Sequence, residues 1–280
     1  MADQDRFARD TAIQPLAPGR YGGRVDPGWS VVDDAAPNGG YLLAIAARAM
    51  RAEATHPDPV SLTGHFLRPP STGEVTIEVE AVRRGRRHDT LAARLLQDDT
   101  ECVRVLSTFG DASAVRGPSR VDLQPPSFPP REECIDTTGQ AAALAAAGKV
   151  PNFPIQQRFD HRQPPELAGW AVGRPAGRGE MGGYVRFSDA EDDDPMDTLG
   201  LLVVADCFAP AVFNAGEGSA SWVPTIELTV QIRARPAPGY LAAHFTTQAI
   251  TNGYLEEDGR IWDAEGNLVA LSRQLALMPR

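Results

Sequence analysis

The chain has 280 residues, 42% of them hydrophobic and 23% charged, with a formal net charge of -10. This composition is typical of a folded globular protein, and the length is enough for two ordinary domains or one duplicated domain. The acidic balance argues against general binding to nucleic acid or to an anionic membrane surface, so we expect neither partner.

Targeting and metal-binding signals are absent from the sequence. No apolar run approaches the roughly 20 residues of a membrane-spanning helix, and the N-terminal residues lack the pattern of a signal peptide, so we expect a cytoplasmic protein. Cys102, Cys134 and Cys207 are scattered, as are the five histidines. No zinc-ligand spacing occurs, and we expect no metal and no other cofactor. We also expect no disulfide bond, because an odd, scattered set of cysteines fits reduced thiols.

The first predicted helix follows a turn at Pro37-Asn38-Gly39-Gly40. Residues 41–50 are rich in Leu, Ala and Met, and apolar side chains cover most of the circumference, which predicts a buried helix. Strands are predicted to follow at 60–67, 74–81, 89–96 and 102–109. One helix followed by an antiparallel meander is an α+β unit.

A proline-rich segment separates this unit from a second one with the same order of elements. Its alanine-rich piece, 140–147, is expected to be a short surface helix. A largely apolar stretch, expected to be helical, spans 196–213, and strands are predicted at 224–235, 240–251, 260–263 and 268–278. Turns at Asp258-Gly259 and Glu265-Gly266 are predicted to join the last strands. We therefore divide the chain into units at 1–110 and 153–280 with a connector at 111–152.

The two units also share a sequence echo. Leu62-Thr63-Gly64-His65-Phe66-Leu67-Arg68-Pro69-Pro70 is matched by Leu228-Thr229-Val230-Gln231-Ile232-Arg233-Ala234-Arg235-Pro236. A repeat this long is typical of a fused pair of domains rather than of a solenoid, and we expect any active site near the seam.

Three polar residues of the second unit are candidates for chemistry. Asp206 lies among apolar and small residues, where a buried carboxylate needs a partner. It could serve catalysis, or it could be a helix cap or the partner of an arginine, and the residues alone leave both open. Thr225 and Gln274 lie on predicted strands, where each taken alone is explained as an ordinary strand residue.

Two features of the first unit could bind a ligand. Arg83, Arg84, Arg86 and Arg87 could hold the phosphates of a ligand such as coenzyme A, or could form a solvated turn. The amides at Asn38-Gly39-Gly40 could hold a carbonyl oxygen or an oxyanion, although a turn alone also explains the glycines. Covalent hydrolase chemistry is disfavoured, because no Gly-x-Ser-x-Gly occurs and Cys207 has no histidine near it in the sequence.

Three stretches, Asn38-Gly39-Gly40-Tyr41, 61–69 and 268–274, resemble the acyl-CoA thioesterase II family, and the match covers about 37–109 and 198–278. The resemblance implies a double hotdog, in which two fused helix-plus-antiparallel-sheet units form one continuous sheet. It also implies hydrolysis of acyl-CoA by a water molecule that Asp206 activates and that Thr225 and Gln274 orient. We expect the substrate- and oxyanion-binding groups to be Asn38, Gly39, Gly40, Tyr41 and His65, with the amides of Gly40 and Tyr41 as oxyanion donors.

Other functions remain open for such a fold. The chain could be a noncatalytic acyl-CoA or lipid-binding hotdog protein, or a hotdog hydratase. Hydratases of this fold usually pair a histidine with a carboxylate, and the second predicted helix has no histidine. A double hotdog leaves sheet edges or faces exposed, so we expect a homo-oligomer, a dimer or higher.

Overall fold

The computed structural model describes residues 6–32, 36–114, 117–148, 152–191, 193–216 and 223–278. The strands of the first unit are β1 Gln14–Ala17, β2 Arg20–Val25, β3 Asp58–Phe66, β4 Gly73–Arg83, β5 Asp89–Gln97 and β6 Thr100–Gly110. Those of the second are β7 Ile135–Asp136, β8 Phe159–Gln163, β9 Glu180–Phe187, β10 Thr225–Ile232, β11 Leu241–Thr246, β12 Ile250–Thr251, β13 Tyr254–Trp262 and β14 Leu268–Leu277. The helices are α1 Arg6–Asp10, α2 Gly39–Glu53, α3 Thr137–Ala146, α4 Pro165–Ala168 and α5 Gly200–Val204. Short 3-10 turns are η1 Pro27–Trp29, η2 Arg131–Glu133, η3 Pro154–Arg158, η4 Gly169–Val172 and η5 Ala211–Ala215.

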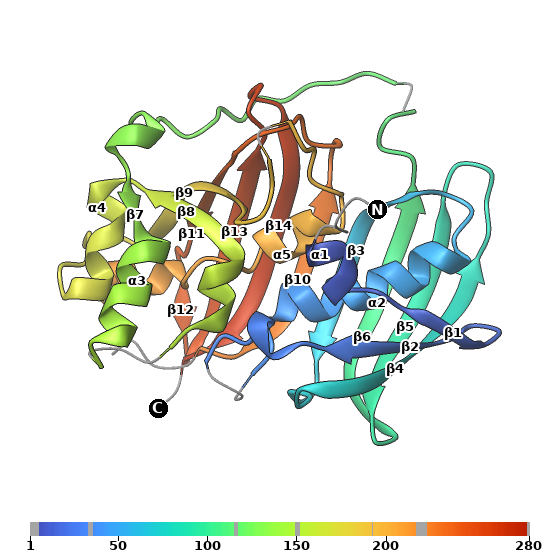
Figure 1. Ribbon diagram of the computed structural model, residues 1–280. Helices are drawn as coiled ribbons and strands as arrows, with labels where there is room; N and C mark the ends of the chain where they lie inside the picture. Colours follow the sequence, from blue (N-terminus) through green and yellow to red (C-terminus); the bar gives the residue numbers. More distant parts are fainter. Residues whose placement is uncertain are drawn as a thin grey trace.

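All the strands of the described residues join one antiparallel sheet of 14 strands (Figure 1). Its order is β1-β2-β4-β5-β6-β3-β10-β14-β13-β11-β9-β8-β7, and β12 pairs with β13. The predicted α+β class with one continuous sheet is confirmed.

The sheet is symmetric about its centre, where β3 pairs with β10. Thr63 lies opposite Thr229, and their hydroxyl oxygens are 2.8 Å apart. From this pair outward, β6, β5, β4 and β2 on one side correspond to β14, β13, β11 and β9 on the other. The sequence echo aligns the same two threonines, so they mark a pseudo-twofold axis between two copies of one unit.

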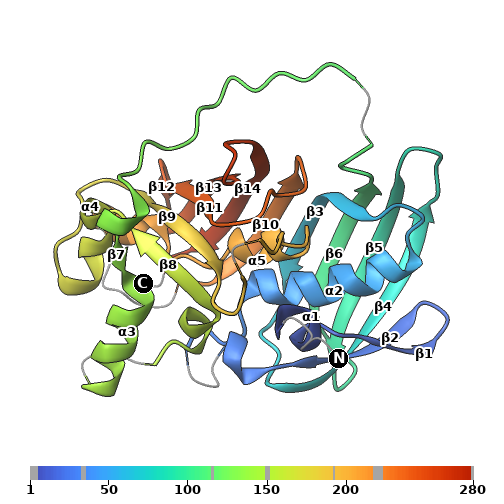
Figure 2. The same cartoon turned by 45° about the horizontal axis from the view of Figure 1, so that its top comes forward.

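Helices α2 and α5 lie next to each other on one side of this sheet (Figure 2). Most of α2 is buried, and Gly40 in its first turn permits the contact with α5, because a Cβ there would lie 2.3 Å from the carbonyl oxygen of Leu202. The apolar faces of both helices and of the sheet form one core, which continues across the seam. The N-terminus of α2 is thus pressed against the second unit.

Two sequence-based predictions need correction. The helix expected over 196–213 is divided into α5 and η5, because the chain turns after Val204 and Pro210 has no amide proton for a helical hydrogen bond. The turn expected at Asp258-Gly259 lies inside β13, since β13 buries every second residue from Leu255 to Ile261. Strands β1, β2, β8 and β9 were not among the predicted elements.

The connector carries the helix expected from its alanine-rich piece, α3. The described part of the chain contains no helix that combines the length and the apolar character needed to cross a bilayer.

Candidate active site at the seam

Asp206 follows α5 and places its carboxylate at the N-terminus of α2. Its Oδ2 accepts hydrogen bonds from Asn38 Nδ2 at 2.9 Å and from the amide of Gly40 at 3.0 Å. Asn38 Nδ2 also donates to the carbonyl oxygen of Asp206 at 2.6 Å. A carboxylate of the second unit therefore accepts a hydrogen bond at the positive, N-terminal end of the first unit's helix.

Asn38 holds this arrangement in place. It is the N-cap of α2, with its side-chain Oδ1 accepting the amide of Tyr41 at 2.9 Å while Nδ2 binds Asp206. Asn38 is 2% exposed. Because both ends of its amide are used, Asn38 fixes the direction of the Asp206 carboxylate rather than remaining free for a substrate.

Burial raises the pKa of Asp206 from 3.8 to about 6, although the amides of Gly40 and Gly39 and the side chain of Asn38 act to lower it. Among the described arginines, none forms an ion pair with this carboxylate. The sequence left two structural roles open for Asp206, a helix cap or the partner of an arginine. The structure shows a contact with the N-terminus of a helix and, among the described residues, no arginine partner. A carboxylate with a pKa near 6 is largely ionised at neutral pH and more basic than an ordinary aspartate.

Thr225 and Gln274 lie on the neighbouring strands β10 and β14. Gln274 pairs with Leu228 and Thr225 pairs with Ala276, so both side chains point to the same face of the sheet, about 7 Å apart along the diagonal. Gln274 is 7% exposed, and its side-chain amide makes no hydrogen bond within the described residues. The free amide is available to a water molecule or a substrate.

Glu257 is a buried acid of this region that the sequence interpretation missed. It lies on β13 directly opposite Gln274, is 8% exposed, and accepts the amide of Ala211 at Oε2 with a distance of 2.5 Å. Burial raises its pKa from 4.5 to about 7, and the charge of Asp206 adds to the rise. The alternation of Leu255, Glu257, Gly259 and Ile261 could have revealed it, had the segment not been taken for a turn.

His65 does not belong to this group. On β3 the buried Leu62 and Gly64 face the helices, whereas His65 points to the opposite face, is exposed, and pairs with Glu227 across the seam. The structure therefore does not bring His65 together with Asp206, and its role in substrate binding stays a prediction. Its neighbour Phe66 faces inward instead, close to Gly39.

The expected oxyanion donors are also already in use. The amide of Gly40 donates to Asp206 and that of Tyr41 to Asn38. Neither amide points to an open position, so the structure does not support the assignment of these two groups as an oxyanion hole.

The arginine cluster lies at the other end of α2. Arg84 donates to the carbonyl oxygen of Glu53, the last residue of the helix, at 2.7 Å, and the side chains of Arg83, Arg86 and Arg87 are exposed in the turn between β4 and β5. A helix of this length spans about 20 Å, which separates the cluster from Asp206. The arginines lie in a solvent-exposed turn, and their binding of coenzyme A phosphates stays a prediction.

Cys207 has no histidine near it in the sequence, but the fold brings His161 into contact with it. His161 Nε2 lies 3.4 Å from Cys207 Sγ, and both residues are buried. Burial lowers the pKa of His161 to about 3 and raises the pKa of the Cys207 thiol well above its usual value. Both groups are therefore neutral, and the pair is not an activated nucleophile.

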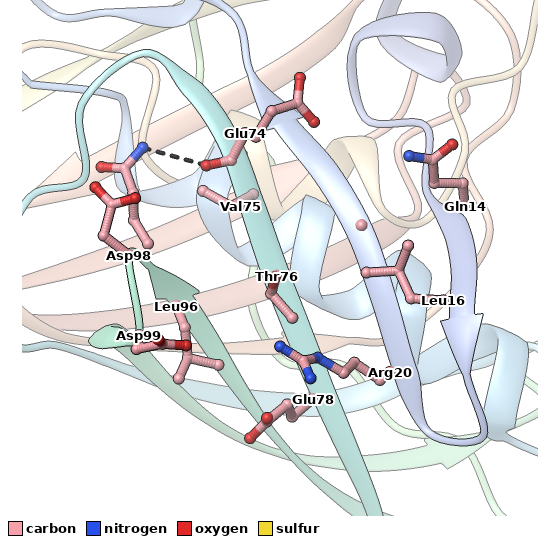
Figure 3. A pocket seen from close by; sticks show the side chains of 12 residues that line it. Gln14, Leu16, Arg20, Glu74, Val75, Thr76, Glu78, Leu96, Asp98 and Asp99 are labelled. Atoms are coloured by element: carbon pink, nitrogen blue, oxygen red, sulfur yellow. Dashed lines mark hydrogen bonds between the residues drawn. The ribbon is translucent and has the colours of Figure 1, made fainter.

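A hollow of about 280 Å³ lies away from this region, near β1, β2 and β4 (Figure 3). Its lining includes Gln14, Arg20, Glu74, Glu78 and Asp98, and none of the predicted site residues. The described residues contain no group of three or more His, Cys, Asp or Glu side chains suited to a metal ion.

Comparison with known proteins agrees with this architecture. Residues 25–110 match the family model of the acyl-CoA thioesterase N-terminal domain, and residues 131–278 match that of the acyl-CoA thioesterase C-terminal domain. An uncharacterised protein of Mycobacterium tuberculosis is 26% identical, with 98% of each chain covered.

Solved structures show the same fold. A candidate thioesterase II of Thermobifida fusca is 30% identical, with both chains fully covered and a TM-score of 0.84. A hotdog-fold protein of unknown function from Alicyclobacillus acidocaldarius has a TM-score of 0.81 at 20% identity, with 99% of each chain covered. A dehydratase domain from Pseudomonas fluorescens, with a TM-score of 0.58 at 13% identity and with 95% of this chain and 97% of that domain covered, shares the fold alone. With both halves matched in order on a symmetric double-hotdog sheet, this chain belongs to the acyl-CoA thioesterase family.

Proposed function

We propose that the protein hydrolyses acyl-CoA thioesters with Asp206 as the general base. The observation that carries this proposal is a half-buried carboxylate that Asn38 and Gly40 hold in one direction, that forms no ion pair with a described cation, and whose pKa is raised to about 6. A base must be ionised at the working pH and still basic enough to take a proton from water. Asp206 meets both requirements.

The other two residues would orient the water. The amide of Gln274 and the hydroxyl of Thr225 lie on one face of paired strands, and Gln274 has no protein partner among the described residues. Asp206 Oδ2 is taken by the α2 terminus, but Oδ1 accepts no hydrogen bond from the described residues and can accept one from water. A thioester carbonyl is already electrophilic, so a positioned water suffices and no covalent intermediate is required.

The test is release of free thiol from a panel of short, medium, long and aromatic acyl-CoAs. Wild type should release thiol from at least one of them. Asp206→Asn should lower kcat by about 100-fold or more, since general base catalysis contributes that much. Thr225→Ala and Gln274→Ala should each lower kcat by less, because each removes one of two orienting groups.

His65→Ala is the matched control, because His65 faces the other side of the sheet, and its turnover should equal that of wild type. Tight binding of acyl-CoA without thiol release would support a noncatalytic binding protein instead. Turnover by Asp206→Asn equal to that of wild type would refute the assignment of the base.

A further inference from the structure

A second buried acid lies on the same face as the proposed catalytic groups. Glu257 and Gln274 are directly opposite each other on β13 and β14, and directly opposite residues of an antiparallel pair have neighbouring side chains. Glu257 is 8% exposed. The hydrolysis proposed above gives this carboxyl no role, and among the described residues its one hydrogen-bond donor is the amide of Ala211.

The surroundings of Glu257 are negative. The charges that act on it are those of Asp206, from the segment after α5, and Glu256 of its own strand, and both raise its pKa. No described arginine forms an ion pair with Glu257 or with Asp206. A buried carboxyl that feels other negative charges and has no cation among the described residues is not easily ionised, so Glu257 keeps its proton to a higher pH than an ordinary glutamate.

The hydrogen bonds of Glu257 indicate where the proton resides. Oε2 accepts the amide of Ala211 at 2.5 Å, so it serves as an acceptor. Oε1 makes no hydrogen bond to the described residues. A neutral carboxylic acid has one O–H donor and keeps an acceptor oxygen, which fits a proton on Oε1 beside Gln274.

We propose that Glu257 is the general acid of the reaction, which protonates the sulfur of the departing coenzyme A. The proposal rests on the thioester hydrolysis proposed above and assigns the second of its two proton transfers. Geometry supports it: Glu257 is a buried carboxyl on the same face of the sheet as Gln274, with one oxygen fixed by Ala211 and the other without a hydrogen bond from the described residues.

The proton balance closes without a further reactant. Water adds to the thioester carbon as its proton passes to Asp206, and the C–S bond then breaks with its electron pair going to sulfur. The O–H of Glu257 gives its proton to that sulfur, which yields the free acid and the thiol. The proton on Asp206 then passes to Glu257, directly or through water, and both groups return to their starting states.

The leaving group provides the test. Glu257→Gln should lower kcat on the best acyl-CoA by about 100-fold, the usual contribution of a general acid. The same acyl group is then offered as the N-acetylcysteamine thioester, whose alkyl thiolate is more basic and gains more from protonation, and as the phenyl thioester, whose less basic thiolate leaves readily without a proton. Glu257→Gln should lose most of its kcat/KM on the first and little on the second, whereas Asp206→Asn should lose it on both.

Glu256→Gln is the matched control, because Glu256 is adjacent on β13 and points to the other face. It should behave as wild type on all three substrates. If Glu257→Gln does not fold, Glu257→Asp carries the same comparison, with a partial loss confined to the alkyl thioester.

Equal losses by the Glu257 variant on the alkyl and phenyl esters would show a structural role and overturn the proposal. So would full activity of Glu257→Gln on acyl-CoA. In both cases the assignment of Asp206 stands, because it is judged by Asp206→Asn; a wild-type protein that releases no thiol from any ester overturns both.

Discussion

The two halves of the molecule treat the N-termini of their helices differently. At α2, Asp206 from the second half accepts the Gly40 amide and meets no cation among the described residues. At α5, Asp197 accepts the amide of Leu199 at 3.0 Å and is held by both terminal nitrogens of Arg51, at 2.8 and 2.7 Å. Each helix terminus thus has an aspartate, but only the second aspartate is neutralised.

The pKa values follow from this difference. Burial raises the pKa of Asp206 to about 6. Burial also acts to raise the pKa of Asp197, but the hydrogen bonds and charge of Arg51 outweigh it and leave that pKa lowered. A symmetric fold offers two similar places, and the presence of one arginine decides which carboxylate is basic. The ion pair at the α5 terminus joins the two halves of the molecule, because Arg51 belongs to α2 and Asp197 precedes α5.

The first way to break this comparison is to neutralise each aspartate in turn. Asp206→Asn should reduce thiol release by about 100-fold or more with the fold retained. Asp197→Asn should leave kcat within about twofold of wild type and lower the free energy of unfolding by about 1 to 2 kcal/mol, because it loses charged hydrogen bonds. Turnover and urea unfolding of both variants check this. Equal losses of turnover would show that the two termini are functionally equivalent.

The second prediction concerns the close approach of the helices. In Gly40→Ala the new Cβ would lie 2.3 Å from the carbonyl oxygen of Leu202, a backbone atom that cannot rotate away. We expect a loss of about 3 kcal/mol in unfolding free energy, the upper part of the range for overpacking, and lower turnover because Asp206 is displaced. In Gly39→Ala the new Cβ would lie 2.8 Å from the ring of Phe66 and 3.0 Å from Asp206 Oδ2, both side-chain atoms that can move, so this variant should be less destabilising. The opposite order would contradict this account.

A third prediction uses pH to test the raised pKa of Glu257 on β13. Glu257 has a folded pKa of about 7 against an ordinary value of 4.5, so its ionisation destabilises the folded state progressively as the pH rises from about 4.5 through 7. Glu257→Gln should have the same free energy of unfolding as wild type at pH 4.5 and a higher one at pH 8, by at most about 3 kcal/mol. Its Tm should change in the same direction. A constant difference at all pH values would contradict the raised pKa.

The fold was predictable from the sequence because its signals are local and repeated. The turn at Asn38-Gly39-Gly40, the unbranched residues after it and the alternation in 74–81 each indicate one element, and the echo around Thr63 and Thr229 indicates the duplication. The length of helix α5 was overestimated, because apolar composition alone does not show where a buried chain turns.

The site was predictable only in part. Asp206 stood out as a lone acid in an apolar stretch, but its contact with Gly40 joins residues 166 positions apart, which no local pattern encodes. His65 was expected to bind substrate because it lies in a matching motif, but a motif does not state which way a strand residue points, and in the fold His65 points away from the face that carries Gln274. Glu257 was missed because the adjacent Asp258-Gly259 predicts a turn, which hides the strand alternation that runs through it from Leu255 to Ile261.

The smallest expected effect sharpens the comparison at the α5 end. Arg51→Met removes the cation from Asp197 but keeps the length of the side chain within α2. The pair is partly exposed, with side-chain exposures of 26% and 35%, so we expect a loss of about 1 kcal/mol and unchanged turnover. Arg51→Lys keeps the charge without the planar fork and should lose less. Urea unfolding at low and high salt measures both, and high salt should narrow the gap between wild type and Arg51→Met, because salt screens a partly exposed pair. A fall in turnover with Arg51→Met as large as that of Asp206→Asn would contradict this separation. It would mean that the Arg51–Asp197 ion pair also sets the position of Asp206, and that the two helix termini act as one site.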